Sequence, residues 1–278
     1  MNKYDDARIH ALEKKSQELR LLTIEMLHRA GSGHPGGSLS AADILTALYY
    51  DEMHIDGNNP KDPNRDRFVL SKGHACPILY AALADTGFFP KDTLWTLRQF
   101  HSILQGHPDM RKVPGVEISS GSLGMGISFG IGTSLGARLS GKSYRTYVLT
   151  GCGELDEGQN WEAFMSAAKF GIDNMTVIVD YNRVQLDGTN DEIMPLGDLP
   201  GKIQSFGWNV VMCNGHDMRS ILQALEQSRV CKGKPTAIIA HTIKGKGVSC
   251  MEGKSEWHGK TVDDKTYKLA LAELRGDD

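Results

Sequence analysis

The chain has 278 residues, a formal net charge of −3 and no block of Lys and Arg. This length is enough for one large α/β domain or two small ones. The charge disfavours nucleic acid and an anionic membrane as partners. No apolar run approaches the roughly 18 residues that span a bilayer, and the charged start of the chain has no apolar signal core. The five cysteines have neither metal-ligand nor disulfide spacing, which indicates a reducing cytoplasm.

The first segments predict two helices separated by a glycine-rich loop. Residues 5–29 carry apolar side chains at helical spacing and predict an amphipathic helix. Residues 31–37 read Gly-Ser-Gly-His-Pro-Gly-Gly and are expected to be too flexible for regular structure. Ser40 with Asp43 resembles a capping box, so a second helix is expected from there through Tyr49.

The segments that follow alternate between strand and helix. A short apolar strand is expected at 68–70, followed by Ser-Lys-Gly-His at 71–74 and a helix with Pro77 in its first turn. Asp92 is expected to cap a helix that runs to about Phe100. A loop over 101–120 leads into 121–140, where six glycines stand. Each costs a helix about 1 kcal/mol relative to Ala, so we expect close helix packing or a ligand there.

The centre of the chain predicts a strand–helix–strand unit. Residues 144–150 are β-branched and aromatic and predict a buried strand, and a tight Gly-Cys-Gly-Glu turn follows at 151–154. A helix is expected over 157–170 and a second strand over 175–179. A right-handed connection brings the ends of both strands to one edge of a parallel sheet, so positions 152 and 182 should face each other there. Ligands of open α/β sheets bind at that edge.

The remaining segments complete a single α/β domain. Strands are expected at 208–213 and 236–241, with a helix at 217–229 between them, a loop over 242–260 and a closing helix at 261–275. Strand–helix alternation with no linker rich in Pro or Ser predicts a doubly wound parallel sheet with helices on both faces. We therefore expect one domain over residues 1–278.

Four histidines stand beside glycine: His34, His74, His107 and His258. Each of them alone is explained by local hydrogen bonds in a loop, but their repetition favours a shared pocket. Imidazoles donate to phosphate and sugar oxygens and exchange protons near neutral pH. No pair has the spacing of a metal site, and neither a nucleophile elbow nor a Walker loop is present.

Consecutive blocks of the sequence resemble transketolase. They include AGSGHPGGSLSAADILTALYY, RDRFVLSKGHACPILYAAL, LQGHPDM, PGVEISSGSLGMGISFGIG and the tail IIAHTIKGKGVSCME…WHG. The central unit is similar to the thiamine diphosphate signature of that family, Gly-Asp-Gly followed by Asn some 30 residues later. The resemblance implies a thiamine diphosphate-binding fold, namely the diphosphate domain. It also implies the N-terminal subunit of a two-subunit enzyme, because a full transketolase is more than twice as long.

The resemblance also implies roles for individual residues. The catalytic positions are His34, His74, His107 and His258. The cofactor-binding positions are His74, Gly121, Ser122, Leu123, Gly151, Gly153, Glu154, Asn182 and His258. The metal positions are Asn182, the Val184 carbonyl and Cys152, which would hold Mg²⁺ or else Ca²⁺ or Mn²⁺.

Cys152 departs from the family pattern, since it stands where the family has its metal-binding Asp. Mg²⁺ and Ca²⁺ prefer oxygen ligands, whereas a thiolate favours softer metals. Three explanations stay open: an altered metal preference, a weakened site rescued by a partner chain, and an inactive subunit. The favoured explanation at this point is a weakened site that a partner chain rescues.

The function implied by the resemblance is transfer of a two-carbon ketol unit from a ketose phosphate to an aldose phosphate. The cofactor supplies the carbon nucleophile, and the protein supplies orientation and proton transfer. A separate C-terminal subunit would provide the catalytic glutamate, most simply in an α2β2 assembly. Two alternatives stay open: a regulatory or scaffold subunit with a decayed metal site, and the α-subunit of a thiamine-dependent 2-oxo-acid dehydrogenase.

Overall fold

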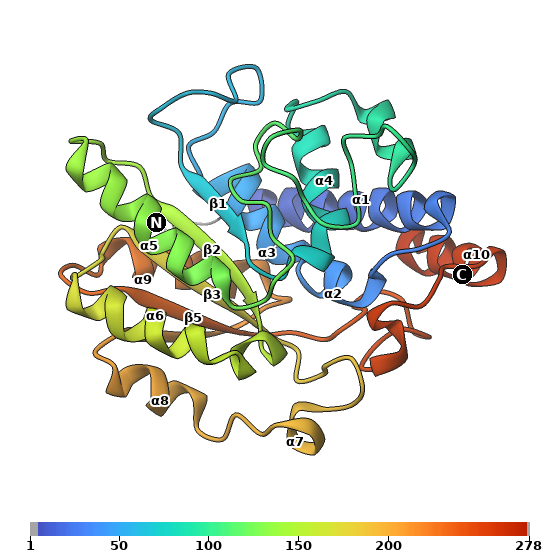
Figure 1. The fold of residues 1–278 in the computed structure, drawn as a ribbon. Coiled ribbons are helices and arrows are strands. Elements are labelled where there is room, and N and C mark those ends of the chain that lie inside the picture. The colour runs from blue at the N-terminus through green and yellow to red at the C-terminus, as the bar shows by residue number, and fades with distance from the viewer. Residues whose placement is uncertain (1–4, 277–278) are drawn as a thin grey trace.

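A single parallel sheet organises the chain (Figure 1), in a computed structural model that describes residues 5–276. Its five strands lie in the order β1-β2-β3-β5-β4. They are β1 (Arg67–Leu70), β2 (Thr146–Gly151), β3 (Met175–Tyr181), β4 (Asn209–Asn214) and β5 (Thr236–His241). All neighbouring strands pair in parallel, so every strand ends at the same edge of the sheet.

Helices cover both faces of the sheet. They are α1 (Asp6–Ala30), α2 (Pro35–Ser40), α3 (Ala42–Ala47), α4 (Cys76–Asp85), α5 (Met125–Leu139), α6 (Gly158–Lys169), α7 (Asn190–Ile193), α8 (Leu199–Ser205), α9 (Met218–Val230) and α10 (Asp264–Arg275). Figure 1 shows α6 and α8 on one side of the sheet and α1 with α4 on the other. The predicted doubly wound α/β architecture is confirmed.

Alternating strand residues divide the core into two layers. Phe68 and Leu70 of β1 join the cluster that packs against α1, α3, α4 and α9. Val69, between them, joins the opposite cluster with α5, α6 and α8. Strand side chains alternate between the two faces, and both faces are apolar because both are covered.

The start of the second helix differs from its prediction. Residues 31–37 are not irregular throughout, because α2 begins at Pro35, where a missing N–H costs nothing in the first turn. Gly36 fits because a Cβ there would lie 2.7 Å from the Trp257 carbonyl oxygen. The expected capping box at Ser40 is wrong. Ser40 ends α2 and donates to Gly37, and Asp43 pairs with Arg20.

Short helical turns in the loops also differ from the predictions. The helix expected from Asp92 to Phe100 is only a 3₁₀ segment, Lys91–Thr96, which begins after Pro90 rather than at an Asp92 cap. Helices α7 and α8 were not expected. Thr189 caps α7 through a capping box with Glu192, a sequence signal that could have found it.

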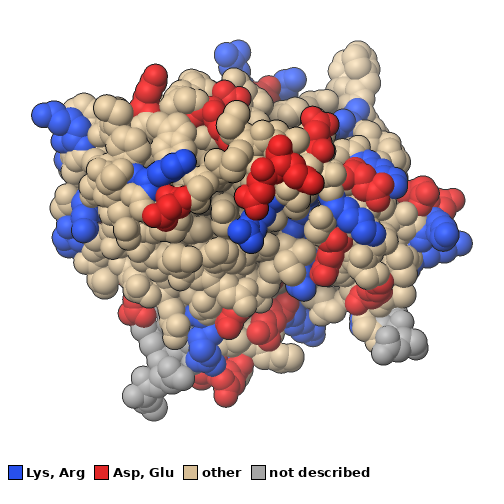
Figure 2. All heavy atoms as spheres, turned by 90° about the horizontal axis from the view of Figure 1, so that it is seen from below, with Lys and Arg blue, Asp and Glu red and all other residues tan. Residues whose placement is uncertain are grey.

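The surface carries interspersed charges on the face drawn in Figure 2, where Lys and Arg alternate with Asp and Glu. Within residues 5–276, no helix is long and apolar enough to cross a membrane. The expectation of a single domain over 1–278 stays a prediction, and residues 1–4 and 277–278 of that range lie outside the described part.

Candidate active site

A pocket of about 210 Å³ lies where β2 and β3 end. Its walls come from α2, the loops after β1, β2, β3 and β5, and the segment before α5. The lining residues are Gly37, Lys72, His74, Leu123, Gly151, Cys152, Gly153, Glu154, Asn182, Val184, Gln185, Leu186, Lys244 and His258. This position is the carboxyl edge at which ligands of parallel sheets bind.

The two predicted halves of the cofactor signature face each other across the β2–β3 pair. Gly151 lies beside Asp180 in the sheet register. The Cys152 thiol and the Asn182 Oδ1 are 3.8 Å apart. The strand–helix–strand reasoning therefore placed these two positions correctly.

Three of the four predicted histidines form a compact cluster at the pocket. The ring centre of His34 is 5.2 Å from that of His74 and 5.4 Å from that of His258. The His74 and His258 centres are 4.8 Å apart. We call these three residues the histidine cluster. His107 lies at its border, 6.3 Å from His34.

Burial keeps the clustered imidazoles neutral near pH 7. Burial, then the charge of Arg98, lowers the pKa of His34 to about 4. Burial, then the charge of Lys244, lowers the pKa of His258 to about 3. Burial and the adjacent His258 also lower the pKa of His74 well below its ordinary value. Neutral rings can accept as well as donate hydrogen bonds, which suits proton exchange with a substrate hydroxyl.

Hydrogen bonding fixes the tautomer of His258. The Lys244 ammonium lies 3.0 Å from its Nδ1. Because an ammonium only donates, Nδ1 accepts, and the proton of the neutral ring sits on Nε2. The buried Nδ1 of His34 has no hydrogen-bond partner among the described residues, and His34 itself is not one of the lining residues of the pocket.

Some predicted residues lie beside the pocket rather than in it. His107, Gly121 and Ser122 line an adjacent, open hollow. The His107 ring is the nearest group to Gly121, 3.6 Å from where a Cβ would stand. Leu123 does line the main pocket, and its carbonyl accepts a hydrogen bond from Gln159 at 2.7 Å.

Glu154 braces the loops around the pocket. Its buried carboxylate accepts hydrogen bonds from the Ser71 hydroxyl and from the N–H groups of Gly124 and Gly151. Burial raises the pKa of Glu154, against the effect of these donors. The carboxylate thus ties together the ends of β1 and β2 and the start of α5.

A buried ion pair that the sequence reasoning missed lies at the wall of the pocket, where Lys72 is a lining residue. The Lys72 ammonium contacts the Asp180 carboxylate and donates to the Gly37 carbonyl at 2.9 Å. Asp180 also accepts hydrogen bonds from the hydroxyls of Ser40 and Thr242. Burial raises the pKa of Asp180, but the charge of Lys72 and the hydrogen bonds from Lys72, Ser40 and Thr242 together outweigh burial, so the pKa is lowered. The sequence signal for this ion pair is an Asp at the end of a strand and a Lys two residues before a site histidine.

Lys244 is the second missed residue, and it enters the pocket from the loop after β5. Its ammonium donates to the carbonyls of Val184 and Gln185 at 3.1 and 3.0 Å. The residue is 2% exposed. Burial, then the charge of Lys72, lowers the pKa of Lys244 to about 8. The glycine- and lysine-rich composition of 242–260 was the only signal for it.

The residues at the expected metal position do not fit a hard divalent ion. The Cys152 thiol is 1% exposed, and burial and the charge of Asp180 raise its pKa. The Lys244 ammonium donates a hydrogen bond to the Val184 carbonyl, another predicted metal ligand. The metal ion stays a prediction that rests on the resemblance. The arrangement of these residues argues against a metal ion here.

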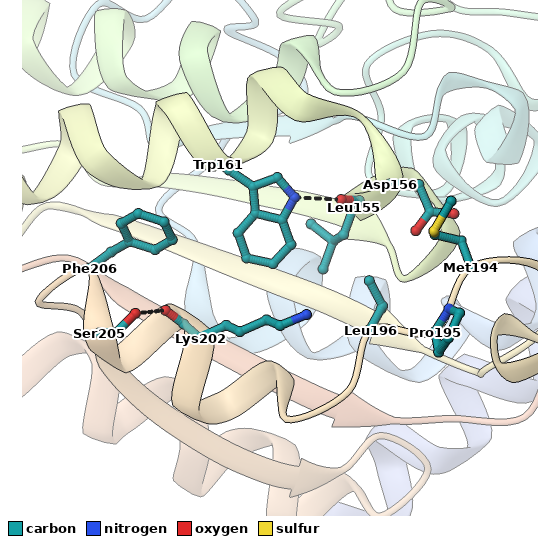
Figure 3. Close-up of a pocket in the computed structure, with 9 residues that line it drawn as sticks. All are labelled: Leu155, Asp156, Trp161, Met194, Pro195, Leu196, Lys202, Ser205 and Phe206. Atoms are coloured by element: carbon teal, nitrogen blue, oxygen red, sulfur yellow. Dashed lines mark hydrogen bonds between the residues drawn. The ribbon is translucent and has the colours of Figure 1, made fainter.

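A second hollow, of about 430 Å³, lies away from the histidines between α6 and α8. Figure 3 shows Trp161 and Phe206 along one side of it and Lys202 beneath the indole. The Lys202 ammonium lies 5.9 Å from the centre of the Trp161 ring. The titratable groups that line it are Asp156 and Lys202, so it does not compete with the histidine pocket as a catalytic site.

Residues 12–275 match the family model of the transketolase thiamine diphosphate binding domain. The chain belongs to the transketolase family. The crystal structure of transketolase from Campylobacter jejuni has a TM-score of 0.91 with this chain at 34% identity. That match covers 96% of this chain and 43% of the other.

Relatives of similar length are also found. The chain is 44% identical to the 6-deoxy-6-sulfo-D-fructose transketolase subunit SqwG of Clostridium sp. (strain MSTE9), over 95% of this chain and 96% of that protein. It is 40% identical to a subunit of the apulose-4-phosphate transketolase of Phocaeicola vulgatus, over 96% of this chain and 95% of that protein. The predicted kinship with the N-terminal subunits of two-subunit transketolases is confirmed. The two alternative functions are not favoured, and the roles of individual site residues stay predictions.

Proposed function

We propose that this chain is the diphosphate-binding subunit of a two-subunit transketolase, whose substrates are a ketose phosphate and an aldose phosphate. The observation that carries the proposal is the histidine cluster at the carboxyl edge of the sheet. It supports the proposal because a scaffold has no need of three neutral imidazoles held against a pocket.

The pocket suits the cofactor that the family binds. Thiamine diphosphate, when bound, supplies the carbon that takes up the two-carbon unit. The diphosphate would lie at the ends of β2 and β3, beside Gly151, Gly153 and the Lys244 ammonium.

The histidine cluster would orient the sugar and move protons. His258 presents an Nε2–H that can donate to a substrate oxygen, because Lys244 holds its Nδ1. His34 and His74, both neutral near pH 7, can accept a proton from a substrate hydroxyl. His107 and the adjacent Ser122 would face the far end of the sugar, at the border of the cluster.

A partner protein would complete the site. We propose that it supplies the catalytic glutamate and the pyrimidine-binding surface, most simply in an α2β2 assembly. We also propose a cytoplasmic location, since all five cysteines, Cys76, Cys152, Cys213, Cys231 and Cys250, are free.

Reconstitution tests the proposal. The purified chain, the purified partner and their mixture are assayed for transfer of a two-carbon unit between sugar phosphates. We expect turnover in the mixture and none in either component by itself. A mixture that assembles and binds thiamine diphosphate but transfers nothing would instead support the scaffold alternative.

A further inference from the structure

The three positions that the family uses for its metal ion are already engaged with one another or with Lys244. The Cys152 thiol lies 3.8 Å from the Asn182 Oδ1 and 3.7 Å from the Asn190 Oδ1. The Asn182 Oδ1 also accepts the Val184 N–H at 3.1 Å. The Val184 carbonyl accepts from the Lys244 ammonium at 3.1 Å. We call Cys152, Asn182, Val184 and Lys244 the cation corner.

The chemistry of the cation corner disfavours a hard ion. Mg²⁺ and Ca²⁺ are held by oxygen ligands, usually with at least one carboxylate. A thiol that faces two amide oxygens is a hydrogen-bond donor there, not a ligand. The two buried carboxylates nearby are committed elsewhere, Asp180 to Lys72 and Glu154 to Ser71 and two backbone N–H groups.

The cation corner nevertheless contains a positive charge. Within residues 5–276, no carboxylate lies within salt-bridge distance of the Lys244 ammonium, although the residue is 2% exposed. Its three hydrogen-bond partners are the Val184 and Gln185 carbonyls and His258, all neutral. Burying an ammonium without an anion is costly. An anion in the pocket would remove that cost.

Backbone and side-chain contacts hold the Lys244 loop in place. The His216 Nε2 accepts the Ile243 N–H at 2.7 Å, and its Nδ1 lies 2.7 Å from Asp43. Asp43 in turn is paired with the buried Arg20 at 2.6 Å. The Gly245 N–H donates to the Gly36 carbonyl at 2.9 Å. The position of Lys244 is therefore built into the fold.

We propose that this chain holds the diphosphate of its cofactor without a divalent metal ion, with the Lys244 ammonium at the place where family members keep the ion. The inference rests on the proposed function, since it needs thiamine diphosphate in the pocket. A neutral thiol with an ammonium carries the same net charge as a divalent ion with one carboxylate. The diphosphate thus meets the same net charge in either arrangement.

Calorimetric titration of thiamine diphosphate tests the proposal. The cofactor is titrated into the complex of this chain with its partner subunit, once in EDTA and once each in Mg²⁺, Mn²⁺ and Zn²⁺. We expect dissociation constants that agree within about twofold. Elemental analysis of the loaded complex should find no stoichiometric divalent ion. Zn²⁺ is included because a thiolate would favour softer metals.

Two variants assign the effect to the cation corner. Lys244→Met should weaken cofactor binding in EDTA roughly 10- to 100-fold, because it removes a charge-assisted hydrogen bond. Lys246→Met is the matched control, since it removes the same charge from the same loop at a side chain paired with Glu252. Cys152→Asp should restore a metal ligand and make binding at least about tenfold tighter in Mg²⁺ than in EDTA. Melting temperatures of the three variants separate lost binding from lost folding.

Each outcome has a distinct meaning. Binding that needs any of the three metals overturns the inference but leaves the proposed function intact. Equal binding by the Lys244→Met variant and the native chain overturns the role of Lys244. An assembled complex that binds no cofactor in any condition overturns the inference together with the proposed function.

Discussion

The histidine cluster and the cation corner adjoin in one pocket, where Lys244 contacts His258 at 3.0 Å, and they relate differently to the family pattern. In the histidine cluster, every residue has the type that the resemblance implies, and the structure brings the three rings within 5.4 Å of one another. In the cation corner, one residue of the pattern is replaced, and a lysine reaches in from a distant loop. The comparison teaches that a family motif predicts where residues lie in both regions. It predicts their chemistry only where the residue types of the family are retained.

The largest effect is expected in the histidine cluster. His74→Ala should lower two-carbon transfer by the complex roughly 10²- to 10⁴-fold, the usual contribution of a positioned acid or base. The melting temperature should change little, because the half-buried ring of His74 lines the pocket and does not belong to the apolar core. Steady-state kinetics and a thermal melt measure the two effects.

His10→Ala serves as the matched control, since the His10 side chain is 84% exposed on α1. It should leave both transfer and melting temperature unchanged. If His74→Ala instead lowers stability strongly while the folded fraction keeps native specific activity, the histidine cluster is part of the core and not of the active site.

The next effect concerns the buried ion pair between Lys72 and Asp180. Lys72→Met leaves the Asp180 carboxylate buried without its partner, which should cost about 3–5 kcal/mol of unfolding free energy. Urea titration of the isolated chain measures this loss. Lys246→Met, which breaks a more exposed pair with Glu252, should cost about 1 kcal/mol or less. Equal losses would show that the Lys72–Asp180 pair does not support the pocket.

The pH dependence of stability should report on two residues of the histidine cluster. His34 and His258 have folded pKa values of about 4 and about 3, below the ordinary value for histidine. The folded chain therefore binds fewer protons than the unfolded chain between these values and about 6.5, and stability falls as the pH falls through that window. The melting temperature of the isolated chain should decrease from about pH 7 to about pH 5.

Substitution by neutral side chains tests whether this pH dependence comes from His34 and His258. The double variant His34→Asn, His258→Gln should flatten the decrease, whereas His10→Ala should leave it as it is. A decrease that is the same in all three proteins would place the responsible groups outside the histidine cluster.

The smallest effect is expected at the thiol of the cation corner. Cys152→Ser keeps a donor of similar size toward Asn182 and Asn190, so stability should change by about 1 kcal/mol or less. Thermal melts of the isolated chain measure it. Cofactor binding in EDTA should also be retained. A large loss of that binding would mean that sulfur has a role beyond hydrogen bonding.

The sequence predicted the sheet and its edge because those features depend on local patterns. Apolar runs bounded by glycine identified the strands, and the right-handed connection rule placed position 152 opposite 182. The cation corner was not predictable in the same way. Lys244 reaches Val184 from a loop about 60 residues further along the chain, and that loop is held by His216, Asp43 and Arg20 from three other segments. Such contacts arise from packing that no local pattern encodes.

The early helix shows a similar limit of local reasoning. Glycines at 36 and 37 indicated a flexible loop, yet they form the start of α2. Close approach to the Trp257 carbonyl explains why Gly36 is needed within a helix. Tertiary packing overrode the low helix propensity of glycine there.

The most direct test of the account is the rate of two-carbon transfer by the assembled complex after removal of metal ions. The complex is dialysed against EDTA, supplied with thiamine diphosphate and sugar phosphates, and assayed with and without added Mg²⁺. The account predicts transfer in EDTA at the same rate as in Mg²⁺, because the histidine cluster retains the chemistry and Lys244 replaces the ion. Transfer that is absent in EDTA and restored by Mg²⁺ would contradict it.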